Sequence, residues 1–209
     1  MNKYIDYFVN TMGPAVQRID APHPAIEKYR GNLPDLLLEF WDKYGWSGYG
    51  DGIFWTVNPA EYDDLVHHWL GESGIANPET FHVIARSAFG DLYLWQSHTL
   101  STVKISTFNA RYQLTIITNL SPEKADIHVS AFFMSKERTT GDYNDLFSDA
   151  LKKLGPLKPD EMYGFVPVIA LGGPNDLEHL EKVKMIEHLT FLSQLTPLTD
   201  WCFPDLKDL

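Results

Sequence analysis

Apolar residues in the N-terminal part of the chain recur at three- and four-residue spacing, the spacing of one face of a helix. The clearest stretch runs over residues 33–44, where Pro34 suits the first turn and Gly45 suits the end. Residues 58–61 form a capping-box pattern that opens a further helix. The predicted helices cover residues 5–12, 26–29, 33–44 and 62–70.

From about residue 80 the apolar period changes from 3.6 to 2, which predicts β-strands. Phe81, Val83 and Ala85 occupy alternate positions, and turn residues separate the segments that follow. These segments are rich in Thr, Ile, Val and aromatic residues, which strands favour. They predict an antiparallel meander over residues 81–86, 92–96, 102–108, 112–118 and 126–134, preceded by a strand at 53–57.

Helical spacing returns over residues 143–154, and a strand is predicted at 163–171. Asn175 and Glu178 form another capping-box pair, which predicts a long helix reaching Leu195. The tail from residue 197 to 209 is expected to fold back onto the body. The order of elements predicts an α+β fold, an antiparallel β-meander of about five or six strands packed with N-terminal and C-terminal helices.

The chain has 209 residues, and no linker, repeat or low-complexity tract divides it. We therefore expect one compact body over residues 1–209; the alternative division is a module over 1–100 followed by a second over 101–209. A single cysteine, Cys202, fits a reducing cytosol. No apolar stretch resembles a secretory signal or is long enough to span a membrane. These features predict a cytoplasmic protein without a membrane partner.

Charge is unevenly distributed along the chain. The formal net charge is −11, and residues 31–80 alone carry −8, with Lys43 as their only basic residue. Residues 141–209 carry −6, whereas residues 81–140 carry +2. This acidity argues against direct binding to nucleic acid and favours a basic partner. The competing interpretation is that the acidic residues form solvated helix faces.

No residue pattern has the spacing of a known catalytic or metal site. The adjacent His67 and His68 point about 100° apart on a helix, so they cannot both bind one metal without distortion. Ser121 and Lys124 have SxxK spacing without its companion motifs, which indicates a turn. The sequence predicts no catalytic residue, no metal, no cofactor and no enzymatic activity.

The carboxylates Glu61, Asp63 and Asp64 leave one enzymatic alternative open. Paired carboxylates in a partly dry cleft perform acid–base chemistry, which would make the chain a small hydrolase. At the start of a predicted helix they also complement the positive end of the helix dipole, which is the favoured interpretation.

Trp46 and Tyr49 lie in the glycine-rich stretch 45–52, which predicts a turn leading into a strand. A large ring in such a turn gains little burial from its neighbours. Exposed Trp and Tyr beside an acidic residue such as Asp51 are typical of protein-recognition surfaces. The alternative is that the protein is a ligand-binding or scaffold module and that these two residues form its binding surface.

Residues 33–46 (LPDLLLEFWDKYGW) and 51–62 (DGIFWTVNPAEY) resemble the GAD-like domain. Residues 164–167 (GFVP) and 170–173 (ALGG) are similar to the second half of bacterial proteins that begin with this domain. Proteins of this build resemble immunity proteins of type VI secretion effectors, in particular those that neutralise DNase toxins. The chain also resembles the wider Smi1/Knr4-like immunity superfamily. The resemblance implies an α+β inhibitor, and its aromatic, Gly and Pro motif residues carry no catalytic signature.

Together these observations predict an immunity protein that binds and neutralises a cognate antibacterial toxin. The expected partner is a basic nuclease of the type VI secretion system, because a nuclease needs a cationic groove for phosphate. Electrostatic attraction to an acidic surface would speed the association. The predicted toxin-binding residues are Asp35, Glu39, Asp42, Trp46, Tyr49, Asp51, Glu61, Asp63 and Asp64.

Overall fold

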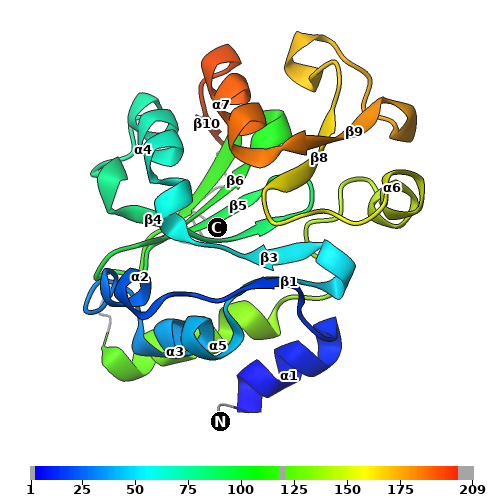
Figure 1. Cartoon of the computed structure of the whole chain (residues 1–209). Helices are drawn as coiled ribbons and strands as arrows, with labels where there is room; N and C mark the ends of the chain where they lie inside the picture. Colours follow the sequence, from blue (N-terminus) through cyan, green and yellow to red (C-terminus); the bar gives the residue numbers. More distant parts are fainter. Residues whose placement is uncertain (1–2, 118–120, 202–209) are drawn as a thin grey trace, which may run out of the picture.

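An eight-stranded sheet lies in the middle of the structure, a computed structural model that describes residues 3–117 and 121–201 (Figure 1). Its strand order is β1-β2-β3-β4-β5-β6-β7-β10, and all neighbours are antiparallel except β10, which runs parallel to β7. A separate antiparallel hairpin pairs β8 with β9. The strands are β1 (Val16–Ile19), β2 (Trp46–Tyr49), β3 (Phe54–Thr56), β4 (Phe81–Ser87), β5 (Leu92–Gln96), β6 (Thr102–Ser106), β7 (Arg111–Thr115), β8 (Glu161–Phe165), β9 (Leu180–Lys184) and β10 (Thr199–Asp200).

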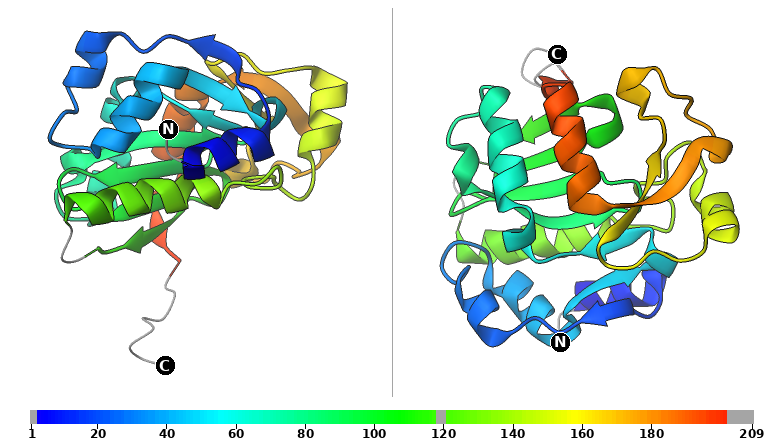
Figure 2. Two further views of the ribbon diagram at one scale, coloured as in Figure 1. Left: turned by 90° about the horizontal axis from the view of Figure 1, so that it is seen from below. Right: turned by 45° about the horizontal axis from the view of Figure 1, so that its top comes forward.

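Helices cover both faces of this sheet (Figures 1 and 2). Helices α1, α3 and α5 lie together on one face, whereas α4 and α7 pack against each other on the opposite face. The predicted α+β class is confirmed. The helices are α1 (Lys3–Met12), α2 (His23–Glu27), α3 (Asp35–Tyr44), α4 (Asp63–Glu72), α5 (Pro122–Met134), α6 (Phe147–Leu154) and α7 (Met185–Leu195).

The helix predicted over residues 33–44 is confirmed as α3, because its signals are local. Its apolar stripe, which includes Leu37 and Trp41, is buried. Gly45 follows the helix with a φ of 67°, a value that favours glycine. A Cβ atom there would lie 2.3 Å from the backbone oxygen of Ile19, so glycine also permits the close approach of β1.

The turn predicted over residues 45–52 is wrong in its first half. Trp46–Tyr49 form strand β2, in which all four residues are buried, and only the short 3₁₀ turn Gly50–Gly52 leads on toward β3. At Gly48 a Cβ atom would lie 3.0 Å from the ring of Trp55. The glycine there allows close packing inside the sheet.

The last strand of the predicted meander, over residues 126–134, is helix α5 instead. Its apolar residues alternate in sequence, which produced the strand prediction. In the helix, Val129 and Phe133 lie one turn apart and are buried, whereas Ile127 is 64% exposed. The Ser121 hydroxyl accepts a backbone N–H of the first turn at 3.4 Å, so the predicted turn there is a helix cap.

The C-terminal predictions place the boundaries wrongly. The strand predicted over residues 163–171 ends at Phe165, and the helix predicted from Asn175 begins only at Met185. Between them lies β9, which pairs with β8. Asp176 caps the 3₁₀ turn before β9, because its carboxylate accepts hydrogen bonds from the backbone N–H groups of Glu178 and His179. The β8–β9 pairing therefore overrides the helical spacing of the leucines.

The predicted return of the tail is seen in β10, which adds to the sheet beside β7. Arg111 donates a hydrogen bond to the backbone oxygen of Asp200 at 3.0 Å. Cys202 and Phe203 lie outside the described residues.

Partly buried hydrogen bonds connect the N-terminal and C-terminal parts of the chain. The Trp69 indole N–H donates to the backbone oxygen of Thr196 at 3.0 Å. The fully buried Arg86 donates to the backbone oxygen of Pro159 at 2.9 Å and lies over the ring of Trp55. These bonds would break if the two parts separated. They therefore favour the interpretation that the chain forms one compact body.

We therefore predict that the two parts of the chain unfold together. Limited proteolysis of the full chain should trim the termini and leave one core, and thermal unfolding should show a single transition. Recovery of two stable fragments, near residues 1–100 and 101–209, that separate without denaturant would contradict this prediction.

The core also contains a cation, Lys136, which is only 7% exposed. Among the described residues, no acidic side chain forms an ion pair with it; its ammonium group instead lies 4.3 Å from the ring centre of Phe132 and 4.5 Å from that of Tyr93. Burial lowers the pKa of Lys136 to about 8 from an ordinary 10.5, and the charge of Lys104 adds to the shift. Because the unfolded chain keeps this proton up to a higher pH, the destabilisation is full below pH 8 and shrinks as the pH rises toward 10.5.

Replacing this lysine by an apolar residue should stabilise the protein at neutral pH. We predict that Lys136→Met raises the free energy of unfolding by about 1–3 kcal/mol at pH 7, and by less at pH 9.5. Urea titrations of both proteins at the two pH values measure this. An equal difference at both pH values would show that the charge of Lys136 is not the cause.

Candidate functional site

The outer surface of α3 carries three carboxylates at one-turn spacing, Asp35, Glu39 and Asp42. All three are exposed, because the opposite side of the helix packs into the core. We call these three residues the α3 face. Among the described residues, no basic side chain lies within ion-pair distance of Glu39 or Asp42. The α3 face is therefore an acidic surface in which, among the described residues, Asp35 alone forms an ion pair, with Arg30.

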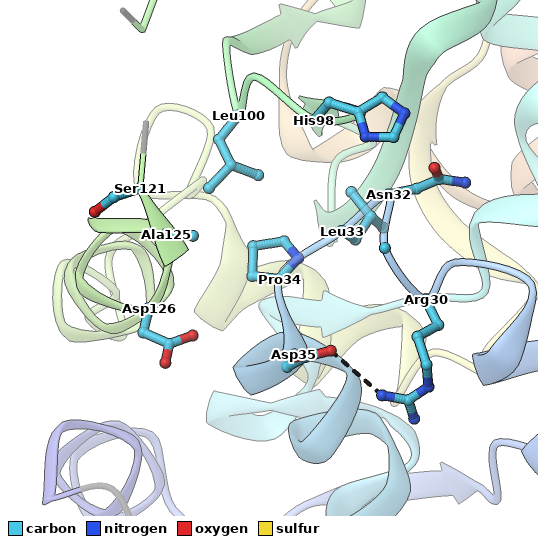
Figure 3. A pocket seen from close by; sticks show the side chains of 11 residues that line it. Arg30, Asn32, Leu33, Pro34, Asp35, His98, Leu100, Ser121, Ala125 and Asp126 are labelled. Carbon is cyan, nitrogen blue, oxygen red and sulfur yellow. Dashed lines mark hydrogen bonds and ion pairs between the residues drawn. The ribbon is translucent and has the colours of Figure 1, made fainter. Parts of the chain in front are cut away.

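Two clefts adjoin the α3 face, and they share Arg30 and Asp35. The first has a volume of about 460 Å³ and lies between the start of α3, the loop after β5 and the start of α5 (Figure 3). Asp126 of α5 and Asp35 of α3 both line this cleft. The second cleft, of about 320 Å³, contains all three carboxylates of the α3 face. Its lining residues are His23, Ile26, Arg30, Asp35, Leu38, Glu39 and Asp42.

Arg30 separates the two clefts and is held in place by two acidic partners. Its guanidinium group binds both carboxylate oxygens of Glu27 at 2.6–3.0 Å and lies 3.3 Å from the carboxylate of Asp35. The hydrogen bond and charge of Arg30 lower the pKa of Glu27. The arginine therefore neutralises Glu27 and part of Asp35, while Glu39 and Asp42 keep their charge available.

The other predicted acidic residues lie apart from the α3 face. Asp51 forms an ion pair with Arg138 at 2.7 Å in the turn between β2 and β3. Glu61 and Asp64 are exposed at the start of α4, whereas Asp63 is partly buried beside Lys28. The predicted acidic residues thus form three separate groups, and of these only the α3 face lines either of the two clefts.

The prediction that Trp46 and Tyr49 are exposed anchors is wrong. Tyr49 is fully buried and packs against Phe8 with 4.9 Å between ring centres, and Trp46 is 7% exposed beside Trp41. Both residues belong to β2, whose two faces are covered. Their role is to support the sheet beneath the α3 face.

Asp63 belongs to a cluster of metal-binding residue types that the sequence pattern did not predict. Asp63, His67 and His82 each offer one ligand atom, and these atoms lie within 4.8 Å of one another. Such a group is able to hold a metal ion. Asp63 and His67 lie one turn apart on the predicted helix, and this spacing, rather than that of the adjacent histidines, is the signal for the cluster in the sequence.

The hydrolase alternative has partial support from the same region. His82 lies between Asp63 (Nδ1 to Oδ1, 3.4 Å) and Ser97 (Nε2 to Oγ, 3.1 Å), the order found in Ser-His-Asp hydrolases. However, the backbone N–H groups of Ser97, His98 and Thr99 all donate to backbone carbonyl groups. They are therefore not available as an oxyanion hole. The exposed Glu61 and Asp64 also lack the dry cleft that acid–base chemistry needs.

Comparisons with known proteins agree with the sequence resemblance. The family model of the GAD-like domain matches residues 3–109, and the model of the C-terminal part of the type VI secretion immunity protein Tdi1 matches residues 126–196. No curated protein matches the chain. A similar solved structure is the crystal structure of Atu4351 from Agrobacterium tumefaciens, with a TM-score of 0.85 and 23% sequence identity over 95% of this chain and 93% of that one. This last likeness establishes the shared fold.

Within residues 3–117 and 121–201, none of the helices is both long and apolar enough to cross a bilayer.

Proposed function

The chain belongs to the GAD-like domain family of type VI secretion immunity proteins, and on this premise we propose that it neutralises a DNase toxin by binding its basic DNA-binding surface. The protein acts in the cytoplasm by forming a complex, without catalysing a reaction. Its acidic surface takes the place of the phosphate groups that the toxin's cationic groove would bind.

The observation that carries this proposal is the concave acidic surface at the α3 face. Its carboxylates line one cleft, and Asp35 extends into a second cleft that also contains Asp126. A concave surface of one charge sign concentrates the field and attracts a partner of the opposite sign. The helix fixes the backbone positions of these three residues, so their spacing is set before the toxin binds.

The C-terminal third, with its net charge of −6, is the competing acidic surface. On α6 its charges are partly neutralised, since Lys152 lies 2.9 Å from Asp149. Asp142, at the start of this region, uses its carboxylate to accept the backbone N–H of Phe147 at 2.9 Å. These carboxylates have local structural partners, which makes them weaker candidates than Glu39 and Asp42.

The test is the binding kinetics of a variant of the α3 face. Glu39→Lys and Asp42→Lys reverse two charges, and Asp35→Asn removes a third without placing a lysine beside Arg30. We predict that this triple variant associates with the cognate toxin, identified by its co-purification with the unchanged chain, at least about 10-fold more slowly at low salt. The difference should shrink as the salt concentration rises, because screening removes long-range attraction.

A matched control changes the net charge equally on the competing surface, through Asp149→Asn, Glu181→Lys and Glu187→Lys. This control should keep the fast association and protect bacteria that express the toxin. Circular dichroism spectra of both variants should match that of the unchanged chain, which checks that they are folded. If the control loses association and protection while the α3 variant keeps both, the assignment of the toxin surface is wrong.

A further inference from the structure

A partly buried metal-ligand cluster joins α4 to the sheet, apart from the α3 face. Asp63 and His67 lie one turn apart on α4, and His82 is the second residue of β4, which packs against that helix. The side chains of Asp63 and His82 are only 18% and 13% exposed. One carboxylate oxygen and one nitrogen of each ring lie within 4.8 Å of one another.

Neighbouring acceptors fix the orientation of both imidazole rings. Nε2 of His67 lies 3.1 Å from the backbone oxygen of Phe81, and Nε2 of His82 lies 3.1 Å from the hydroxyl of Ser97. A backbone oxygen only accepts, so Nε2 of His67 carries a proton and Nδ1 keeps its lone pair. Metal-binding histidines commonly donate their second N–H to an oxygen in this way.

The contact between Asp63 and His82 leaves room for a cation. Oδ1 of Asp63 faces Nδ1 of His82 at 3.4 Å, which is longer than a charge-assisted hydrogen bond. The other oxygen, Oδ2, lies 3.5 Å from the ammonium group of Lys28. Asp63 can therefore keep Lys28 as a partner on one oxygen and offer the other oxygen to a metal ion.

We propose that Asp63, His67 and His82 bind one divalent transition-metal ion, with Zn²⁺ as the best match. Two imidazole nitrogens and one carboxylate suit zinc, whereas Mg²⁺ and Ca²⁺ favour oxygen ligands alone. In a tetrahedral site with metal–ligand bonds of about 2.0–2.2 Å, the ligand atoms lie about 3.4 Å apart. The three ligand atoms here lie within 4.8 Å of one another, so small side-chain rotations would bring them to that separation. The fourth position is taken by water, and the ion ties α4 to β4.

The proposal is tested on the untagged full chain after treatment with EDTA. We expect one equivalent of Zn²⁺ in calorimetry and, with Co²⁺ as a probe, visible absorption bands of a low-symmetry site. Metal in about 100-fold excess over its dissociation constant should raise the melting temperature by about 5–10 °C, because it binds the folded state alone. His67→Gln and His82→Gln should each weaken Zn²⁺ binding at least about 10-fold and abolish the Co²⁺ bands.

His68→Gln is the matched control, since His68 is adjacent to His67 but exposed and pairs with Glu72. This variant should bind metal as the unchanged chain does. Two results would overturn the proposal: no binding of either ion at about 100 µM, or equal loss of binding in His68→Gln and His67→Gln. Should His82→Gln fail to fold, His67→Gln decides the outcome alone, because it alters only the helix side of the cluster.

Discussion

The central strands of the sheet are buried on both faces, and the positions of the other elements follow from this constraint. Six of the seven residues of β4 are buried, and β3 is buried throughout. A strand covered on both sides needs apolar layers above and below it. Helices α3 and α5 supply one layer and α4 and α7 the other (Figures 1 and 2). Segments from both ends of the chain are therefore required to complete the core.

The same constraint explains which elements the sequence could predict. For α3 the apolar stripe, Pro34 and Gly45 are signals within one short segment, so the helix was predictable. The burial of all four residues of β2 depends on neighbours on both sides of the sheet, and its glycines suggested a turn instead. In α5 an accidental alternation of apolar residues masked the helical pair Val129 and Phe133. In β9 the pairing with β8 overrides the local pattern.

Some parts of the candidate site were likewise predictable from the sequence, and others were not. Exposed carboxylates one turn apart on a helix were predictable, and Asp35, Glu39 and Asp42 lie on one face as helical spacing requires. The clefts beside them were not, because they form where α3 meets segments distant in sequence. His82 joins Asp63 and His67 only through the packing of α4 on β4. No single-segment pattern contains that information.

We propose that the α3 face, which buried aromatic residues support from below, is the surface by which this chain recognises its toxin. Hydrogen–deuterium exchange of the full chain with and without its toxin tests this proposal most directly. We predict that toxin binding slows amide hydrogen exchange most strongly in α2 and α3, which line the second cleft. Protection confined to α6, β9 and α7, with α2 and α3 unchanged, would contradict it.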